Sequence, residues 1–143
     1  MAPAAAPHYA TSIEAEEAFY GAFRRGSLAD MMAVWDDSPD ITCIHPLADR
    51  LTGRDAVGAS WRAILRQPLD FTLAERSVTE LGDLAVHVLH EIITDPATGR
   101  PAAPMVATNI YRRVPAGWRM ILHHASPARA AAAPAQAPAG TVH

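Results

Sequence analysis

Residues 71–126 read FTLAERSVTELGDLAVHVLHEIITDPATGRPAAPMVATNIYRRVPAGWRMILHHAS, and this stretch decides the fold. Apolar and polar residues alternate along it, which is typical of β-strands with one buried face. Turn sequences interrupt the alternation at Gly82-Asp83, at a long loop rich in proline and glycine, and at Pro115-Ala116-Gly117. The strands between these turns are expected at residues 71–81, 84–94, 105–114 and 118–126. We therefore predict four consecutive antiparallel strands.

The sequence before residue 71 has apolar residues at helical spacing instead. Thr11 and Glu14 have the spacing of a capping box, and Gly26 stands where the apolar stripe ends, so a first helix is expected between them. Ser27 and Asp30 repeat the N-terminal pattern and predict a second, short helix. Two helices joined by a tight turn therefore open the domain.

One more strand and one more helix are expected before the four-strand stretch. Residues 41–45 are short and rich in β-branched side chains, and Pro46 closes them, which predicts a strand. A third helix is expected to start at Thr52, with Asp55 as its capping partner, and to end before Pro68.

The predicted order of elements is helix, helix, strand, helix and four strands. Helices in the N-terminal half and a mostly antiparallel sheet indicate the α+β class rather than alternating βαβ units. A curved sheet packed against three helices encloses a pocket. The expected fold is therefore a cone-shaped α+β domain.

The length of 143 residues is enough for one domain with one core. Both ends are rich in alanine and proline and cannot bury enough apolar surface to offset the entropy of ordering them. We therefore expect a flexible N-terminal tail at residues 1–10, a folded domain at residues 11–126, and a disordered C-terminal tail at residues 127–143.

Composition excludes several classes of partner. The formal net charge is only −3 and no basic cluster is visible, so no nucleic-acid partner is expected. The sequence has no apolar run of about 18 residues and no basic start, so we expect neither a membrane span nor a signal peptide. The single cysteine, Cys43, excludes an internal disulfide. A cytoplasmic protein is the resulting expectation.

Short motifs spread over the folded part resemble those of one known superfamily. They are FYGAFRRGSL at 19–28, CIHP at 43–46, LTGRDAV at 51–57, TNIYRR at 108–113, GWR at 117–119 and HHAS at 123–126. In this order and spacing they resemble the nuclear transport factor 2-like superfamily, in particular its ketosteroid isomerase and SnoaL-like polyketide cyclase group. The resemblance implies the same cone fold.

The resemblance also implies roles for single residues. In ketosteroid isomerases a general-base aspartate precedes the proline at the end of the first strand, and His45 stands in that place. A neutral imidazole can also accept a proton, so His45 is a candidate acid or base. The family's hydrogen-bond-donating acid falls on Asn109, whose amide can still donate. The family's donor tyrosine falls on Phe19, and the adjacent Tyr20 is expected to point about 100° away.

Both candidate catalytic residues also have a structural alternative. His45 is expected either to act in the pocket or to be a polar residue at a strand end that bonds to a loop. Asn109 is expected either to contact a ligand or to be a buried amide satisfied by the protein. The predicted ligand-binding residues are Phe19, Tyr20, Trp35, Trp61, Tyr111 and His124.

The histidines on the strands are assigned to faces by alternation. His123 and His124 are neighbours, so only one of them can face the interior. His124 shares its face with Trp118, Met120 and Leu122, so we predict that His124 lines the pocket. On strand 84–94, His87 and Glu91 share one face, and polar residues on an antiparallel sheet indicate the outer surface or an interface.

No metal or cofactor is expected. Seven histidines are present, but no pair of cysteines and no His-Glu-x-x-His pattern accompanies them. The acid–base chemistry implied for His45 needs no cofactor. Cys43 lies two residues from His45, but an isolated buried cysteine is usually an inert packing residue.

Three functions from different classes remain open. The first is an isomerase, cyclase or dehydratase that acts on a small apolar carbonyl or hydroxyl compound, with His45 as acid or base. The second is a noncatalytic module that holds a small-molecule ligand. The third is an assembly domain, because Trp118 and residues 124–126 also resemble the end of the association domain of calmodulin-dependent kinase. An assembly domain is expected to form rings or higher oligomers. Otherwise the resemblance implies a homodimer through the outer sheet faces, and two-fold pairing is the commonest closed symmetry.

Overall fold

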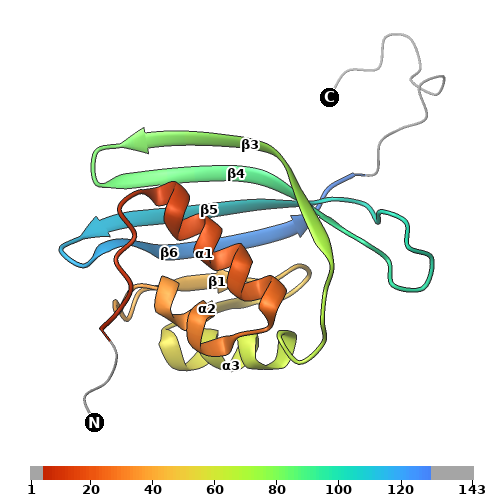
Figure 1. The fold of residues 1–143 in the computed structure, drawn as a ribbon, viewed down its shortest axis with the longest axis horizontal. Coiled ribbons are helices and arrows are strands. Elements are labelled where there is room, and N and C mark those ends of the chain that lie inside the picture. Colours follow the sequence, from red (N-terminus) through yellow and green to blue (C-terminus); the bar gives the residue numbers. More distant parts are fainter. Residues whose placement is uncertain (1–4, 130–143) are drawn as a thin grey trace.

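The computed structural model describes residues 5–129, in which three helices pack on one face of a six-stranded sheet (Figure 1). The helices are α1 (Ser12–Arg25), α2 (Leu28–Val34) and α3 (Arg54–Ile64). The strands are β1 (Thr42–Ile44), β2 (Arg50–Thr52), β3 (Phe71–Leu81), β4 (Leu84–Ile93), β5 (Met105–Val114) and β6 (Gly117–Pro127). Most of the predicted C-terminal tail, and residues 1–4 of the N-terminal tail, lie outside the described residues.

The sheet has the strand order β2-β1-β6-β5-β4-β3. All neighbouring strands are antiparallel except β1 and β6, which are parallel. The predicted run of four antiparallel strands is therefore confirmed, and the α+β class with it. Figure 1 shows α1 crossing the sheet face over β5 and β6, with α2 and α3 below it.

The helix caps explain where the first two helices begin and end. Thr11 Oγ1 accepts a hydrogen bond from the Glu14 backbone N–H at 3.1 Å, and Ser27 Oγ accepts one from Asp30 N–H at 3.1 Å. Gly26 ends α1 with a left-handed φ of 67°, a conformation that glycine adopts at little cost. The predicted starts of both helices are confirmed.

The prediction that Thr52 caps the start of the third helix is wrong. Thr52 is the last residue of β2, where it pairs with Thr42 of β1, and Gly53 is the N-cap of α3 with no side-chain cap. The short strand β2 was not expected. It turns back along β1 and carries the chain from the sheet edge into α3.

Apolar side chains from the helices and the sheet pack against one another and form the core. The largest buried ones are aromatic, and they come from α1, from α3, from β5 and from the residue after α2: Phe19, Tyr20, Trp35, Trp61 and Tyr111. The same interior holds buried polar side chains, including His87 and Glu91 of β4. The prediction that His87 and Glu91 lie on the outer surface is therefore wrong, because this face of β4 turns toward α1.

A β-bulge corrects the assignment of the two histidines on β6. Ile110 pairs with Leu122 while Tyr111 pairs with Met120, so Ile121 is an extra residue on β6 and the alternation of faces is reversed beyond it. His123 is 2% exposed, whereas His124 is an exposed residue. The prediction that His124 faces the interior is wrong.

Within the described residues, no helix combines the length and the apolar character that crossing a membrane requires.

Candidate functional site

His45 follows the end of β1 and lies half-buried against α3. Its Nε2 is 2.9 Å from Ser60 Oγ, and the Ser60 hydroxyl donates its single proton to the Val57 carbonyl at 2.7 Å. Ser60 Oγ can therefore only accept from the imidazole, so the proton of neutral His45 sits on Nε2. Burial lowers the pKa of His45 below its usual value, so the ring is neutral at neutral pH. The nitrogen left to take a proton is Nδ1.

Trp61, the residue after Ser60, stands between His45 and the core. Its ring packs edge-on against His45 at a centroid distance of 4.9 Å and against Phe19 at 5.5 Å. Trp61 is fully buried, and its indole N–H has no hydrogen-bond partner among the described residues. A buried donor without a partner costs about 1–3 kcal/mol, so this N–H, like the equally unpartnered indole N–H of Trp35, would be stabilised by a polar ligand atom.

Cys43 lies beside His45 and Trp61 but is not activated. Its sulfur is 3.5 Å from His45 Nε2. Burial raises the pKa of the Cys43 thiol to about 12, and the polar contact from the neighbouring Trp61 indole N–H opposes this only in part. A thiol that stays protonated is a poor nucleophile. The geometry therefore favours a packing role for Cys43.

A chain of four buried polar side chains runs across the inner face of the sheet. The Tyr20 hydroxyl of α1 donates to Glu91 Oε2 of β4 at 2.7 Å, and Asn109 Nδ2 of β5 donates to the Tyr20 oxygen at 3.0 Å. Asn109 Oδ1 is 2.6 Å from His123 Nδ1 on β6. Three neighbouring strands and one helix are thus joined through side chains. Both Tyr20 and its neighbour Phe19 are buried.

The charges along this chain follow from its burial. Burial raises the pKa of Glu91, and the hydrogen bond from Tyr20 opposes part of the rise. Burial, together with the Glu91 carboxylate, raises the pKa of Tyr20 well above its ordinary value. Burial lowers the pKa of His123 to about 3, with smaller contributions from His45 and His124. His123 is therefore a neutral imidazole at physiological pH.

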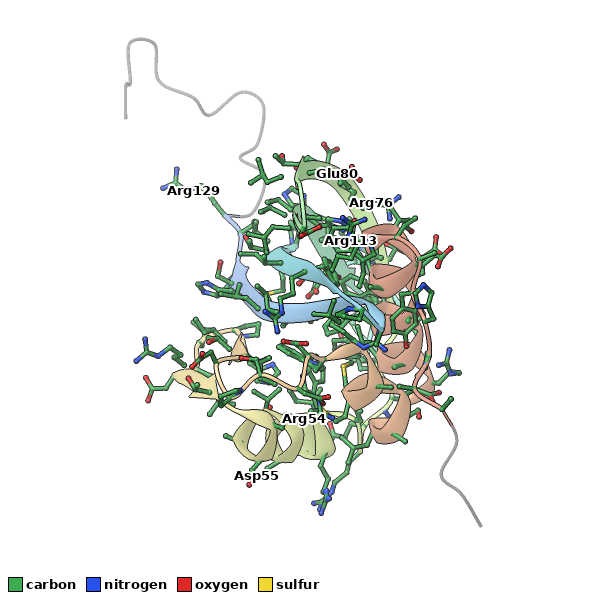
Figure 2. All side chains as sticks on the ribbon, turned by 90° about the vertical axis from the view of Figure 1, so that its left-hand side faces the viewer. Arg54, Asp55, Arg76, Glu80, Arg113 and Arg129 are labelled. Carbon is green, nitrogen blue, oxygen red and sulfur yellow. The ribbon has the colours of Figure 1, made fainter. Side chains whose placement is uncertain are left out.

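A second buried cluster ties α1 to the sheet nearer the start of the helix. Glu16 Oε2 is 2.6 Å from His87 Nδ1, and Glu16 Oε1 accepts from Arg76 at 3.3 Å. His87 Nε2 is 2.9 Å from Ser12 Oγ, and the Tyr111 hydroxyl donates to Glu16 at 3.4 Å. Figure 2 shows Arg76 reaching from β3 toward α1. The Tyr111 side chain of β5 therefore helps to hold α1 against the sheet.

The predicted ligand-binding residues therefore fall into four places. Phe19, Tyr20 and Trp61 surround His123 and His45 in the interior. Tyr111 belongs to the Glu16 cluster, and Trp35 forms a parallel bridge to Met120 beside α2. His124 is on the outer face of the sheet. Among residues 5–129, no three His, Cys, Asp or Glu side chains are arranged to hold a metal ion.

Ser60, Glu91 and His123 were missed by the sequence analysis. Glu91 could have been found, because it shares a strand face with Ala85 and Leu89, which are small or apolar and form the buried side of β4. His123 required the bulge at Ile121, for which alternation offers no signal.

The chain is similar to one family model and to several solved structures. A family model described as a SnoaL-like domain matches residues 13–130. A proposed calcium/calmodulin-dependent protein kinase type II association domain from Thiobacillus denitrificans is 40% identical, with a TM-score of 0.82 over 86% of this chain and 99% of that chain. A proposed dehydratase of the NTF2-like family from Streptomyces avermitilis is 33% identical, with a TM-score of 0.72 over 81% of this chain and 92% of that chain.

A protein with a cystatin-like fold from Nostoc punctiforme is similar in fold alone. Its TM-score is 0.70 at 12% identity, over 85% of this chain and 96% of that chain. No curated protein matches the sequence.

Proposed function

Because the chain belongs to the SnoaL-like domain family, we propose that it acts on a small molecule held between the helices and the sheet, by acid–base chemistry of the dehydratase, isomerase or cyclase class. The 33% identical relative described as a proposed dehydratase supports this class. The reaction uses no cofactor in this proposal. Its substrate is a small, largely apolar compound with a carbonyl or hydroxyl group.

His45 carries the proposal, because it combines three properties of a general base. It is half-buried beside the aromatic interior, its pKa is lowered by burial so that the ring is neutral, and Ser60 holds the proton on Nε2. In the proposed step, Nδ1 removes a proton from the carbon next to a carbonyl, and the electron pair of that bond moves toward the carbonyl oxygen. His45 then returns the proton to another carbon in an isomerase, or to a departing hydroxyl in a dehydratase.

Asn109 has a supporting role in this proposal. Its amide nitrogen and oxygen are both engaged, with Tyr20 and with His123. It therefore positions these two side chains, while Phe19, Tyr20 and Trp61 form the wall against which the apolar part of the substrate packs.

Exchange of carbon-bound protons tests the proposal without knowledge of the natural substrate. In heavy water, the protein should accelerate deuterium incorporation next to the carbonyl of a small ketone such as cyclohexanone. His45→Gln should lower this acceleration by about 100-fold or more, since a positioned general base contributes that much. His124→Gln is the matched control and should keep it. A wild-type protein that exchanges no faster than buffer, across a panel of small ketones, would exclude the catalytic role of His45.

A second candidate function is assembly through the outer sheet face. Val86 and Val88 of β4, Ile110 of β5 and Leu122 of β6 lie side by side on this face and are half-buried, with no helix covering them. The 40% identical relative is described as a proposed association domain. We propose that a second copy of the chain covers this face in a homodimer, since two-fold pairing is the commonest closed symmetry.

A further inference from the structure

We infer that His123 and Trp61 together form a binding subsite for a hydroxyl group, and that the ligand of this domain therefore carries a neutral hydroxyl group rather than a carboxylate. The inference rests on the proposed function in that it uses the same interior, and it adds the chemical class of the ligand.

The polar chain from Glu91 fixes which nitrogen of His123 carries the proton. Tyr20 gives its only proton to Glu91, so the Tyr20 oxygen accepts from Asn109 Nδ2. The amide oxygen of Asn109 has no proton to give, so His123 Nδ1 must be the donor in the 2.6 Å contact between them. Neutral His123 then has its lone pair on Nε2, as a hydrogen-bond acceptor.

The position of the strands shows where this acceptor lies. Asn109 is on β5, on one side of β6, and it is paired directly with His123. The two ring nitrogens of an imidazole point in nearly opposite directions, so Nε2 is directed to the other side of β6, where Cys43 of β1 is the paired residue. His45 and Trp61 lie there as well, with ring centroids 6.4 Å and 5.8 Å from that of His123. No residue described in the structure donates a hydrogen bond to Nε2.

Trp61 supplies the opposite half of the subsite. Its indole N–H is buried and completes no hydrogen bond among the described residues; its neighbour, the Cys43 sulfur, is only a weak acceptor, so an oxygen lone pair would satisfy it better. The two rings are neighbours, with centroids 5.8 Å apart, so one oxygen placed about 2.9 Å from both nitrogens would bridge them. This oxygen must accept from Trp61 and donate to His123.

Only a group with both a lone pair and a proton fulfils both demands. A hydroxyl does so, whereas an ether or a ketone can only accept. An ionised carboxylate has no proton to donate, and it would also have to be desolvated in an interior that holds the Glu91 carboxylate. The subsite therefore selects neutral hydroxyl compounds.

The protonation of His123 can be measured directly on the full chain with isotope-labelled histidine. Nitrogen chemical shifts should show a proton on Nδ1 and none on Nε2, unchanged from about pH 8 to about pH 5. A proton on Nε2, or titration of the ring near its ordinary pKa, would overturn the inference. This measurement does not depend on activity, so its failure leaves the catalytic proposal for His45 standing.

Phenol, toluene and benzoate are probes of similar size that test the ligand class. Titrated into the full chain, phenol should bind about threefold to tenfold more tightly than toluene, and benzoate more weakly than phenol. A purely apolar cavity would show the reverse order for phenol and toluene, because phenol loses its hydrogen bonds with water. That order, or no binding of phenol at millimolar concentration, would contradict the inference.

Variants locate the preference at the two named side chains. Trp61→Phe removes only the N–H donor and keeps an aromatic ring, so it should reduce the preference for phenol over toluene toward one. His123→Leu should do the same where it folds, and His124→Leu, the same change one residue along on the outer face, should keep the preference. An unchanged preference in Trp61→Phe would exclude this subsite, whereas a confirmed subsite without proton exchange in ketones would mean a binding protein rather than an enzyme.

Discussion

The hydroxyl of Tyr20 donates a 2.7 Å hydrogen bond to the carboxylate of Glu91, and both side chains are buried between α1 and β4. A carboxylate in an apolar interior is stabilised only by such partners. The pKa of Glu91 is raised by burial, which means that its charged form is already disfavoured in the folded protein. This contact therefore contributes directly to the stability of the fold.

Tyr20→Phe should destabilise the protein by about 1–3 kcal/mol at neutral pH, because Glu91 loses its donor while it stays buried. Urea unfolding measures the change. Glu91→Gln in the Tyr20→Phe background removes the charge and should recover part of the loss. A Tyr20→Phe protein as stable as the wild type would show that the contact makes no net contribution.

The lowered pKa of His123 predicts loss of stability in acid. In the folded protein this pKa is about 3, against 6.5 for an ordinary histidine. Below pH 6.5 the unfolded chain therefore binds a proton that the folded chain excludes. As the pH is lowered, the free energy of unfolding decreases by about 1.4 kcal/mol per pH unit until the folded pKa is reached. The raised pKa of Glu91 has the opposite sign and offsets part of this loss between its ordinary value of 4.5 and its higher folded pKa.

Chemical unfolding from pH 7 down to about pH 5 measures this slope. His123→Gln should have a shallower slope than the wild type, and His124→Gln, at the exposed neighbour, should keep the wild-type slope. Equal slopes in all three proteins would mean that His123 takes up a proton in the folded state.

Much of the fold could be predicted because interactions between residues close in sequence determine where its helices and long strands begin and end. The caps at Thr11, Ser27 and Gly26 are interactions between residues a few positions apart, and the four long strands alternate regularly between turn sequences. Thr52 fits a helix cap equally well by local pattern, but pairing with Thr42 decides its place. The choice between helix cap and strand residue depends on Thr42, ten residues away, so the sequence next to Thr52 does not reveal it.

The candidate site was predicted less completely, for the same physical reason. Alternation placed His87 and Glu91 on one face correctly, yet their burial depends on partners about seventy residues away on α1. One bulged residue, Ile121, reversed the faces of His123 and His124. Polar residues at a bulge or in a buried network break the rule that polar side chains face water, so a sequence pattern alone assigns them to the surface.

Gly117 and Gly82 are a matched pair of turn glycines that report on the N-terminal segment. Both have positive φ, at 108° and 69°. A Cβ at Gly117 would lie 2.8 Å from the Tyr9 backbone oxygen, whereas a Cβ at Gly82 has no atom within 4 Å. Alanine should therefore cost about 1 kcal/mol at Gly82 from backbone strain alone, and clearly more at Gly117.

Thermal or urea unfolding of Gly117→Ala and Gly82→Ala compares the two sites. The additional loss at Gly117 measures how firmly residues near Tyr9 are held against the β5–β6 turn, where Trp118 N–H donates to the Tyr9 carbonyl at 2.9 Å. Equal losses at the two glycines would mean that the segment moves aside at little cost.

We predict that two copies of the chain pair through the outer sheet face, and that a single charged residue introduced there dissociates the dimer. Val88 lies in the middle of this face, between Ser77 of β3 and Thr108 of β5, and Thr79 lies on the same face at the exposed β3 edge. Val88→Glu would bury an unpaired carboxylate in the interface, and a penalty of about 3 kcal/mol raises the dissociation constant more than 100-fold. Sedimentation at micromolar concentration should therefore show a wild-type dimer and a Val88→Glu monomer, with Thr79→Glu still dimeric because its side chain reaches water. If Val88→Glu also remains a dimer while its unfolding transition stays cooperative, the two copies meet through another surface.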